Sequence, residues 1–300
     1  MPRPSPLLMV LGAVGLGCVL DGVAKDASRE ASVLVLTAGR YAFGALVLSA
    51  GFVLGRRRWP GPESWRFHAG RGVAVATAAL SFFAAVHLLP LAVATTLGFT
   101  AVLMVAPLGW AILGERPSGF AFVAAVVGLA GAGLAASGTE GAAGGSVVAG
   151  TAAALLAAFA YALALVLVRL RTRAEDPATI LLLANVVPAG LLVPVAAMAV
   201  TVGAVRAPSP GVVPDASLMG VLGVSIWWLM TQAYASAPAW RLAPLEYVAL
   251  PISAALGYVW FGEVPGWRAW AGAAVIVAAC LAVALEERLR TPRAAATLDV

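Results

Sequence analysis

Three ionisable side chains lie within stretches that are otherwise apolar, and they are the first candidates for chemistry. Asp21 follows an apolar N-terminal run, Arg40 lies nine residues into the apolar stretch 31–53, and Glu246 lies near the start of the stretch 242–262. A charged side chain at the centre of a lipid bilayer costs about 2.5–3.5 kcal/mol on insertion scales, and such residues commonly serve binding or proton transfer. We therefore expect Arg40 to bind a carboxylate, while Asp21 balances its charge or carries a proton. A structural ion pair between Arg40 and Asp21 is the alternative.

Glu246 lies about one helical turn inside its apolar stretch, where water at the membrane surface can reach it. We expect it to act as a gate or as a proton acceptor; the alternative is an interfacial ion pair with Arg241. Two further carboxylates, Glu115 and Glu263, each lie two residues before a proline. Because proline is favoured at the start of helices, these two glutamates are expected to mark helix boundaries rather than to contact a ligand.

Aromatic and hydrogen-bonding side chains in the stretch 216–240 form a second group of candidates. Trp228 and Thr231 share one helical face there, and an internal repeat described below aligns this face with one that carries Phe83 and His87. These four residues are expected to line opposite walls of a largely apolar cavity, so Trp228→Ala should impair function. The alternatives are simple aromatic packing, an aromatic belt at the membrane surface and a surface position for His87. Weaker candidates for the same cavity are Tyr161, Thr96 and Phe99.

The composition identifies the kind of protein that must position these residues. The 300 residues are 62% hydrophobic and 11% charged, whereas an ordinary soluble domain is about half apolar and about a quarter charged. The sequence therefore predicts an integral membrane protein. Its net charge of +5 comes from arginines scattered between apolar runs, which is not the clustered pattern that binds nucleic acid. The only cysteines, Cys18 and Cys280, lie in apolar runs and are expected to be buried thiols.

Apolar stretches long enough to cross a bilayer, about 20 residues each, indicate ten transmembrane helices. The region 72–114 supplies two of them, which break at Leu88-Leu89-Pro90 because proline cannot continue a helix. The other eight spans are expected at 6–23, 31–53, 117–139, 141–168, 177–205, 216–240, 242–262 and 269–285. The predicted fold class is therefore an all-α integral membrane protein.

Basic residues are divided unevenly between the connections of these spans. With the N-terminus in the cytoplasm, fourteen of the 19 Lys and Arg residues fall in cytoplasmic segments and four in outer segments. Since cytoplasmic loops are enriched in Lys and Arg, both termini are expected in the cytoplasm. The fourteen are Arg3, Arg56, Arg57, Arg58, Arg66, Arg71, Arg116, Arg169, Arg171, Arg173, Arg241, Arg288, Arg290 and Arg293, and the four are Lys25, Arg29, Arg206 and Arg268.

The chain repeats itself at an offset of 148 residues. Gly-Glu-x-Pro occurs at 114–117 and at 262–265, and the same offset aligns Pro90 with Pro238. Each half holds five expected spans, an odd number, so the two halves should have opposite orientations in the membrane. Inverted repeats of this kind support alternating access to a central site. Prolines within spans are expected to serve as gating bends, or else as static kinks; they are Pro107 and Pro251, together with Pro188 and Pro194.

These features together resemble the drug/metabolite transporter superfamily, in its ten-helix form with two EamA-type repeats. The resemblance covers residues 7–287 and implies a first repeat at 1–138, a second inverted repeat at 139–287 and a cytoplasmic tail at 288–300. One departure exists, because the second half has no arginine that corresponds to Arg40. The motifs that carry the resemblance are the two Gly-Glu-x-Pro boundaries, Gly39-Arg40-Tyr41, the segment from His87 to Ala92 and the segment from Val168 to Arg171.

The resemblance implies a multi-pass carrier of the bacterial-type inner membrane that moves a small organic metabolite, with amino-acid export as the expected activity. Its partners would be the small-molecule substrate and the lipid bilayer, with protons as an open coupling ion. No nucleic acid and no obligate protein partner is expected. We expect no enzyme activity, cofactor or metal, since the sequence lacks a phosphate-binding loop and a His-Glu-x-x-His motif. A passive pore or facilitator, and a membrane-embedded enzyme, remain alternatives.

Overall fold

The computed structural model describes residues 5–114, 118–137, 144–170, 175–237, 242 and 245–296, with the side chains of 144–145 and 287–296 left undescribed. All regular secondary structure in these ranges is helical, which agrees with the predicted all-α fold. Glu115 and the proline that follows it, the expected boundary between the repeats at 138–139, and Arg241 lie outside the described residues.

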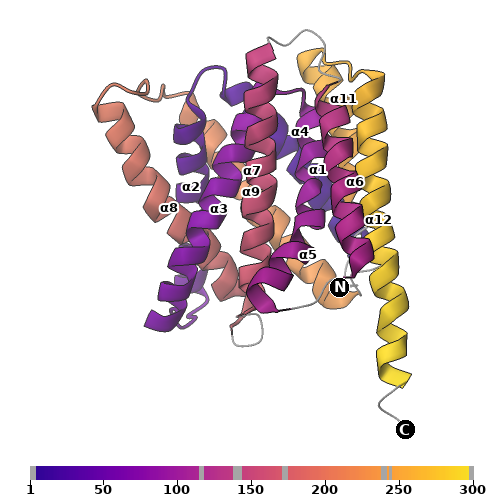
Figure 1. The fold of residues 1–300 in the computed structure, drawn as a ribbon. Coiled ribbons are helices and arrows are strands. Elements are labelled where there is room, and N and C mark those ends of the chain that lie inside the picture. The colour runs from indigo at the N-terminus through magenta and orange to yellow at the C-terminus, as the bar shows by residue number, and fades with distance from the viewer. Residues whose placement is uncertain are drawn as a thin grey trace.

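The helices follow one another along the chain with short connections (Figure 1). In the first half they are α1 (Pro6–Ala27), α2 (Val33–Leu54), α3 (Pro62–Leu88), α4 (Leu91–Gly98), α5 (Thr100–Leu113) and α6 (Gly119–Ala136). In the second half they are α7 (Gly144–Arg169), α8 (Pro177–Thr201), α9 (Val212–Ser236), α11 (Ala249–Phe261) and α12 (Trp267–Ala296).

The ends of these helices follow from local sequence. Pro6, Pro62 and Pro177 each lie at the first helical position. The backbone N–H that proline lacks would have no partner within the helix there. At the other end, Gly114 and Gly262 cap α5 and α11 in the left-handed conformation, with φ of +71° and +67°, which a side chain would disfavour. The glycines of the repeated Gly-Glu-x-Pro motif therefore end helices, as expected.

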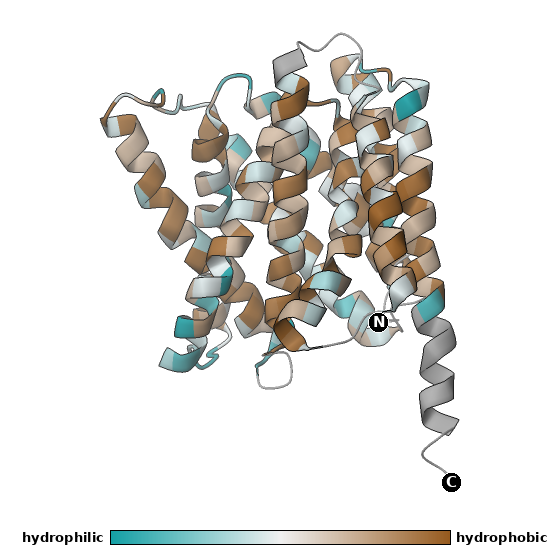
Figure 2. Cartoon of the chain, in the orientation of Figure 1, coloured by the Kyte–Doolittle hydropathy of each residue, from teal (hydrophilic) through white to brown (hydrophobic). Residues whose placement is uncertain are grey.

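Within the described residues, nine helices are long and apolar enough to cross a membrane, and α11 is a shorter apolar helix (Figure 2). The predicted break before Pro90 is confirmed, since Leu89 is extended and α4 begins at Leu91. A second break, at Phe99, was not predicted; it divides one span into α4 and α5. The protein is thus a multi-pass membrane protein.

The expected span 242–262 is not one continuous helix. The helix α11 begins only at Ala249, and the stretch before it contains Pro244. Pro251 falls in the first turn of α11, where backbone N–H groups have no partner within the helix. Pro251 therefore removes no hydrogen bond within α11, and its role as a gating bend stays a prediction. Pro107, by contrast, lies inside α5. The last helix, α12, continues to Ala296, through much of the expected tail.

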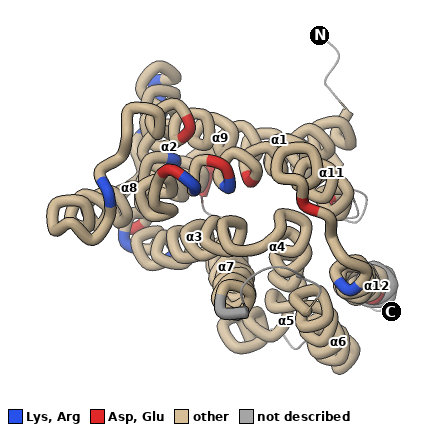
Figure 3. Tube along the Cα trace, turned by 90° about the horizontal axis from the view of Figure 1, so that it is seen from above, with Lys and Arg blue, Asp and Glu red and all other residues tan. Residues whose placement is uncertain are grey.

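Seen from above, α2, α9, α1 and α11 follow one another along one side, and α3, α7 and α4 lie opposite them (Figure 3). The helix α9 packs on α1 and α2, whereas α7 packs on α3, α4 and α5. The helices α6 and α12 pack closely on each other at the edge of the bundle. A Cβ atom on Gly272 of α12 would lie 2.5 Å from the carbonyl oxygen of Gly131 in α6, so glycine is required for this contact.

Candidate functional site

Three positions on one face of α9 each meet a polar or aromatic side chain from another element. Gly223, Trp227 and Tyr234 are spaced by four and seven residues, which places them along one helical face. Over these eleven residues the helix rises by about 16 Å, at about 1.5 Å per residue. We call this face of α9 the inner face, because Trp227 on it meets Tyr161 of α7 from the opposite side of the bundle.

Arg40 of α2 lies beside Gly223 at one end of the inner face. Its guanidinium carbon is 4.7 Å from the ring centre of Tyr41 and 5.5 Å from that of Phe83. Asp21 of α1 interacts with Arg40 electrostatically, yet these two side chains form no direct ion pair among the described residues. Arg40 therefore lies near both Asp21 and Phe83, without direct contact between the two charged groups. The role of Arg40 in binding a ligand stays a prediction.

Tyr161 of α7 and Trp227 of α9 meet at the middle of the inner face. Their ring centres are 6.5 Å apart and their planes are inclined by 47°. Tyr161 is 41% exposed and Trp227 is 39% exposed. Tyr161 lies on the side of α7 opposite to the exposed Leu156 and Phe159, so its exposed surface points into the bundle. An aromatic pair thus connects two helices on opposite sides of the bundle, and both rings remain partly accessible.

Tyr234 and Glu246 meet at the third position of the inner face, where the phenol hydroxyl donates a hydrogen bond to Glu246 Oε1. Glu246 and Arg71 are also close enough to interact electrostatically with Tyr161. A carboxylate therefore lies at the end of the inner face opposite to Arg40. The expected ion pair with Arg241 involves a residue outside the described ranges.

Phe99 and Tyr247 form a second aromatic contact, with ring centres 5.0 Å apart. These residues are separated by 148 positions, which is the offset of the internal repeat. Phe99 lies at the break between α4 and α5. The weaker expectation that Phe99 belongs to the cavity stays a prediction, and its contact is with Tyr247 rather than with Trp227.

Three other expected residues have hydrogen-bond partners of their own. Thr96 and Thr231 use their hydroxyl hydrogens within their own helices, donating to the carbonyl oxygens of Ala92 and Trp227 at 2.7 Å. His87 is exposed, and its Nδ1 lies 2.8 Å from the hydroxyl of Ser28 near the end of α1. The expectation that these residues line a cavity stays a prediction.

Trp228 lies on a different face of α9 from Trp227. Successive helical residues are rotated by about 100°, and Trp228 falls in line with the exposed residues Leu218 and Val221. Its side chain is 53% exposed. The structure therefore favours Trp227 over Trp228 as the tryptophan that faces the interior.

A buried polar cluster lies at the end of the bundle where α1 finishes, which we call the Lys25 end. The Nζ of Lys25 is 2.7 Å from Glu263 Oε1. Lys25 also donates hydrogen bonds to the carbonyl oxygens of Val86 and Leu89, and Glu263 Oε2 accepts the backbone N–H of Leu91 at 2.8 Å. These contacts join α1, α3 and α4 of the first half to the segment that follows α11.

A second buried polar cluster lies near the opposite end. His68 Nε2 of α3 is 2.7 Å from Glu175 Oε2, which lies just before α8. Arg71 of α3 donates from Nε to the carbonyl oxygen of Ala164 in α7 at 3.2 Å. Both ends of the bundle therefore carry buried polar contacts between the two halves of the chain.

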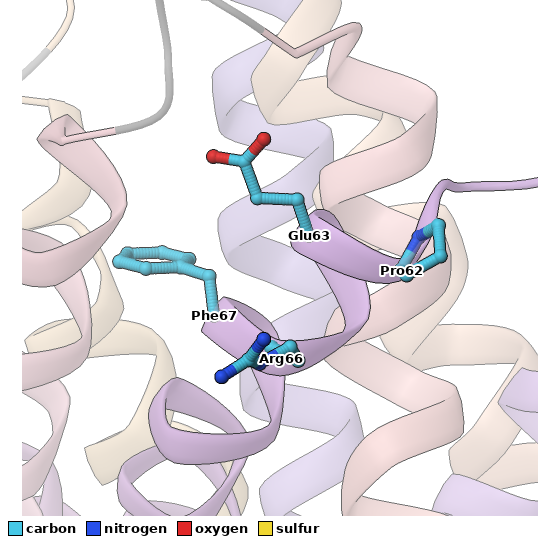
Figure 4. A pocket seen from close by; sticks show the side chains of 4 residues that line it. All are labelled: Pro62, Glu63, Arg66 and Phe67. Atoms are coloured by element: carbon cyan, nitrogen blue, oxygen red, sulfur yellow. The ribbon is translucent and has the colours of Figure 1, made fainter.

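An open pocket of about 560 Å³ lies at the start of α3, away from the inner face of α9. It is lined by Pro62, Glu63, Arg66 and Phe67 (Figure 4). Among the described residues, no group of three or more His, Cys, Asp or Glu side chains could hold a metal ion. The two cysteines are buried and free, as expected.

Both halves of the chain, residues 5–137 and 148–285, match the EamA-like transporter family. The chain belongs to this family. The resemblance to the drug/metabolite transporter superfamily is thereby confirmed. A solved structure, titled only as the crystal structure of a protein, matches 96% of this EamA-like transporter and 99% of its own chain. Its TM-score is 0.61 and its sequence is 21% identical, so the likeness concerns the fold alone.

Three curated relatives of this EamA-like transporter are each named riboflavin transporter. The protein from Vibrio cholerae is 40% identical over 58 residues, which are 19% of this chain and 20% of the relative. That from Brucella anthropi is 30% identical over 131 residues, or 42% and 45% of the two chains. That from Rhizobium johnstonii is 34% identical over 73 residues, or 24% of each chain. The matched segments thus span less than half the length of these relatives.

Sequence reasoning missed several residues of the EamA-like transporter that the structure brings into contact. The sequence analysis favours Trp228 as the tryptophan that lines the interior. The spacing of seven residues from Trp227 to Tyr234 also indicates a shared face and could have identified Trp227. Gly223 carried no signal, because glycines are frequent throughout the chain. Lys25, the only lysine, was counted as an outer surface charge, yet its partner Glu263 is 238 positions away.

Proposed function

We propose that this EamA-like transporter is a secondary carrier for a small planar heteroaromatic metabolite of the riboflavin class, which it moves by alternating access. The observation that carries the proposal is the aromatic pair Tyr161 and Trp227, whose rings are in contact across the bundle and remain 41% and 39% exposed. Offset or tilted aromatic rings bind flat aromatic ligands favourably, and binding sites are commonly apolar with a few polar groups. The names of the three relatives support the same class of substrate.

The amino-acid substrate implied by the earlier resemblance is a competing proposal. A free amino acid is small and carries two charges, and the tilted pair of large rings gives it little to contact beyond its side chain. A flavin has a flat tricyclic ring that can lie against Trp227 and Tyr161 and a polar chain that can reach hydrogen-bonding groups. The inner face of α9, about 16 Å long at about 1.5 Å per residue, suits the longer ligand.

The proposal includes two inverted halves around a shared interior. Support comes from the fourth span of each half: Glu263, just after the end of α11, accepts the N–H of Leu91 at the start of α4. The start of the fourth span of the first half therefore meets the end of the fourth span of the second half. The contact between Phe99 and Tyr247, which correspond at the repeat offset, fits a pseudo-twofold axis nearby. Inverted halves can exchange conformations and so open the interior to either side.

Placement in an inner membrane with both termini in the cytoplasm belongs to the same proposal. It rests on the excess of basic residues in segments on the side of the N-terminus. In this orientation the Lys25 end faces the outside. Net export is the direction that the family resemblance implies, and net uptake is the other outcome of the experiment below.

Transport by the purified full-length chain in liposomes tests this function. We expect saturable uptake of radiolabelled riboflavin that unlabelled riboflavin competes and that amino acids do not. Uptake of a labelled amino acid without uptake of riboflavin would overturn the substrate class. Ion conductance without saturable uptake would identify a pore, and recovery of chemically altered riboflavin would identify an enzyme.

A further inference from the structure

The guanidinium of Arg40 lies inside the bundle, and its Nε–H donor is unused among the described residues. Its Nε is buried and has no hydrogen-bond partner among the described residues. Asp21 acts on it only through its charge. Buried polar groups in proteins nearly always have a hydrogen-bond partner, so an exception calls for an explanation. An arginine within an apolar bundle with an unused Nε–H is placed to bind an external acceptor.

Aromatic rings hold this guanidinium in place without using its donors. The faces of Tyr41 and Phe83 lie 4.7 Å and 5.5 Å from the guanidinium carbon. Cation–π contacts of this kind attract the charge to the ring face, and they leave the N–H groups in the guanidinium plane available. Phe83 is itself buried against Leu20 and Met219, which fixes its ring.

Gly223 lets the guanidinium lie directly against α9. A Cβ atom at this position would be 3.0 Å from Arg40 Nη2 and 3.2 Å from Nε, which is closer than ordinary van der Waals contact. Gly223 precedes Trp227 by one helical turn on the inner face, a rise of about 6 Å. The donor group and the aromatic pair are therefore neighbours along the same face.

We propose that Arg40 forms a subsite for a planar pair of neutral hydrogen-bond acceptors on the ring system that Trp227 and Tyr161 stack against. In a flavin such a pair is a ring carbonyl oxygen and the adjacent ring nitrogen. The fixed fork of a guanidinium matches two acceptors in one plane, which a lysine ammonium does not. Asp21 counters the charge of Arg40, so a neutral acceptor pair fits better than a carboxylate. Gly223 is a positioning residue for this subsite. The inference rests on the proposed function and assigns the orientation of the substrate.

Binding to the purified full-length protein in detergent tests the subsite, with riboflavin fluorescence quenching as the readout. Arg40→Lys keeps the charge but loses the fork, and we expect it to weaken riboflavin binding about tenfold. Gly223→Ala should weaken binding in the same direction, because the new methyl group displaces the guanidinium. Arg57→Lys changes an exposed arginine paired with Asp176 and serves as the matched control.

Two analogues identify the atoms that Arg40 contacts. In 1-deazariboflavin and 5-deazariboflavin, one ring nitrogen beside a carbonyl group is replaced by carbon. The wild-type protein should bind one of them clearly more weakly than riboflavin, and Arg40→Lys should lose this discrimination. Equal binding of riboflavin and both analogues by the wild type, or unchanged riboflavin binding by a monodisperse Arg40→Lys protein, overturns the subsite while leaving the proposed function intact.

A wild-type protein that binds no riboflavin overturns the proposed function and the subsite together. Competition of riboflavin binding by a free amino acid, lost in Arg40→Lys, would assign the subsite to a carboxylate and would overturn its assignment to a neutral acceptor pair.

Discussion

The ammonium group of Lys25 lies 2.7 Å from Glu263 Oε1, and this ion pair joins the end of α1 to the segment after α11. Both side chains are mostly buried, at 10% and 17% exposure. Because Glu263 also holds the N–H of Leu91, one carboxylate connects three elements at the Lys25 end. A carrier that opens at this end has to break the contact, so we regard the pair as the closure of the Lys25 end.

Removing the charge of Glu263 should favour opening at the Lys25 end. Glu263→Gln loses the ion pair but can still accept the N–H of Leu91, so we expect the closed state to lose stability. The measurement is maleimide labelling of a cysteine placed at the buried Ala92, which should become several times faster. Asp26→Asn is the control, since Asp26 pairs with Arg29 only at 3.9 Å between exposed side chains.

The double variant Lys25→Met with Glu263→Gln separates gating from misfolding. Breaking a buried pair from one side costs about 3–5 kcal/mol, because a buried charge is left uncompensated. The double variant removes both charges, so its melting temperature should lie above that of Lys25→Met alone. Labelling at position 92 that stays as slow as in the wild type in every variant would show that the pair does not close this end.

Replacing each of the adjacent tryptophans should distinguish the two faces of α9. Trp227→Ala removes the partner of Tyr161, and loss of an aromatic contact worth about 0.5–1.5 kcal/mol should weaken riboflavin transport roughly threefold to tenfold. Trp228→Ala should have little effect, although the sequence alone favours that residue. Initial transport rates at several riboflavin concentrations, corrected for the amount of protein inserted, provide the comparison. The reverse result would place the substrate on the other face.

Neutralising Glu246 should uncouple transport from protons. Glu246 contacts the inner face of α9 through Tyr234, its hydrogen-bond donor, and a carboxylate inside a membrane bundle is a common proton carrier. We expect Glu246→Gln to abolish the stimulation of transport by a pH gradient while exchange of labelled for unlabelled riboflavin continues. Tyr234→Phe, which keeps the carboxyl group, should retain the stimulation. Persistent pH-driven accumulation in Glu246→Gln would exclude this residue from coupling.

The buried pair of His68 and Glu175 should contribute more to stability than the exposed pair of Arg57 and Asp176. The first pair has side chains that are 1% and 7% exposed, and the second has 49% and 55%. His68→Leu should therefore lower the melting temperature in detergent clearly, whereas Arg57→Ala should change stability by less than about 1 kcal/mol. Equal effects of the two substitutions would show that burial of the first pair does not stabilise the fold.

Much of the fold follows from local features that the sequence alone displays. The apolar stretches predicted the spans because burial of about 20 apolar residues in lipid needs no partner from elsewhere in the chain. The break before Pro90 and the helix end at Gly262 were also predictable, since proline and glycine restrict or permit backbone conformations locally. The break at Phe99 was not, because no proline marks it and the glycine before it, Gly98, is one of 32 in the chain.

The orientation of each helix about its own axis was decided by tertiary packing. Both Trp227 and Trp228 lie in a helix that is apolar nearly all round, so its sequence does not distinguish an interior face from a lipid-facing one. Contacts with α7 made Trp227 the interior residue. Likewise, the position of Lys25 at the end of a span indicates a surface charge. It becomes part of a buried ion pair only because the fold brings Glu263, 238 residues away, into contact with it. Hydrophobicity therefore determined which segments enter the membrane, and packing between distant segments determined which side chains face one another there.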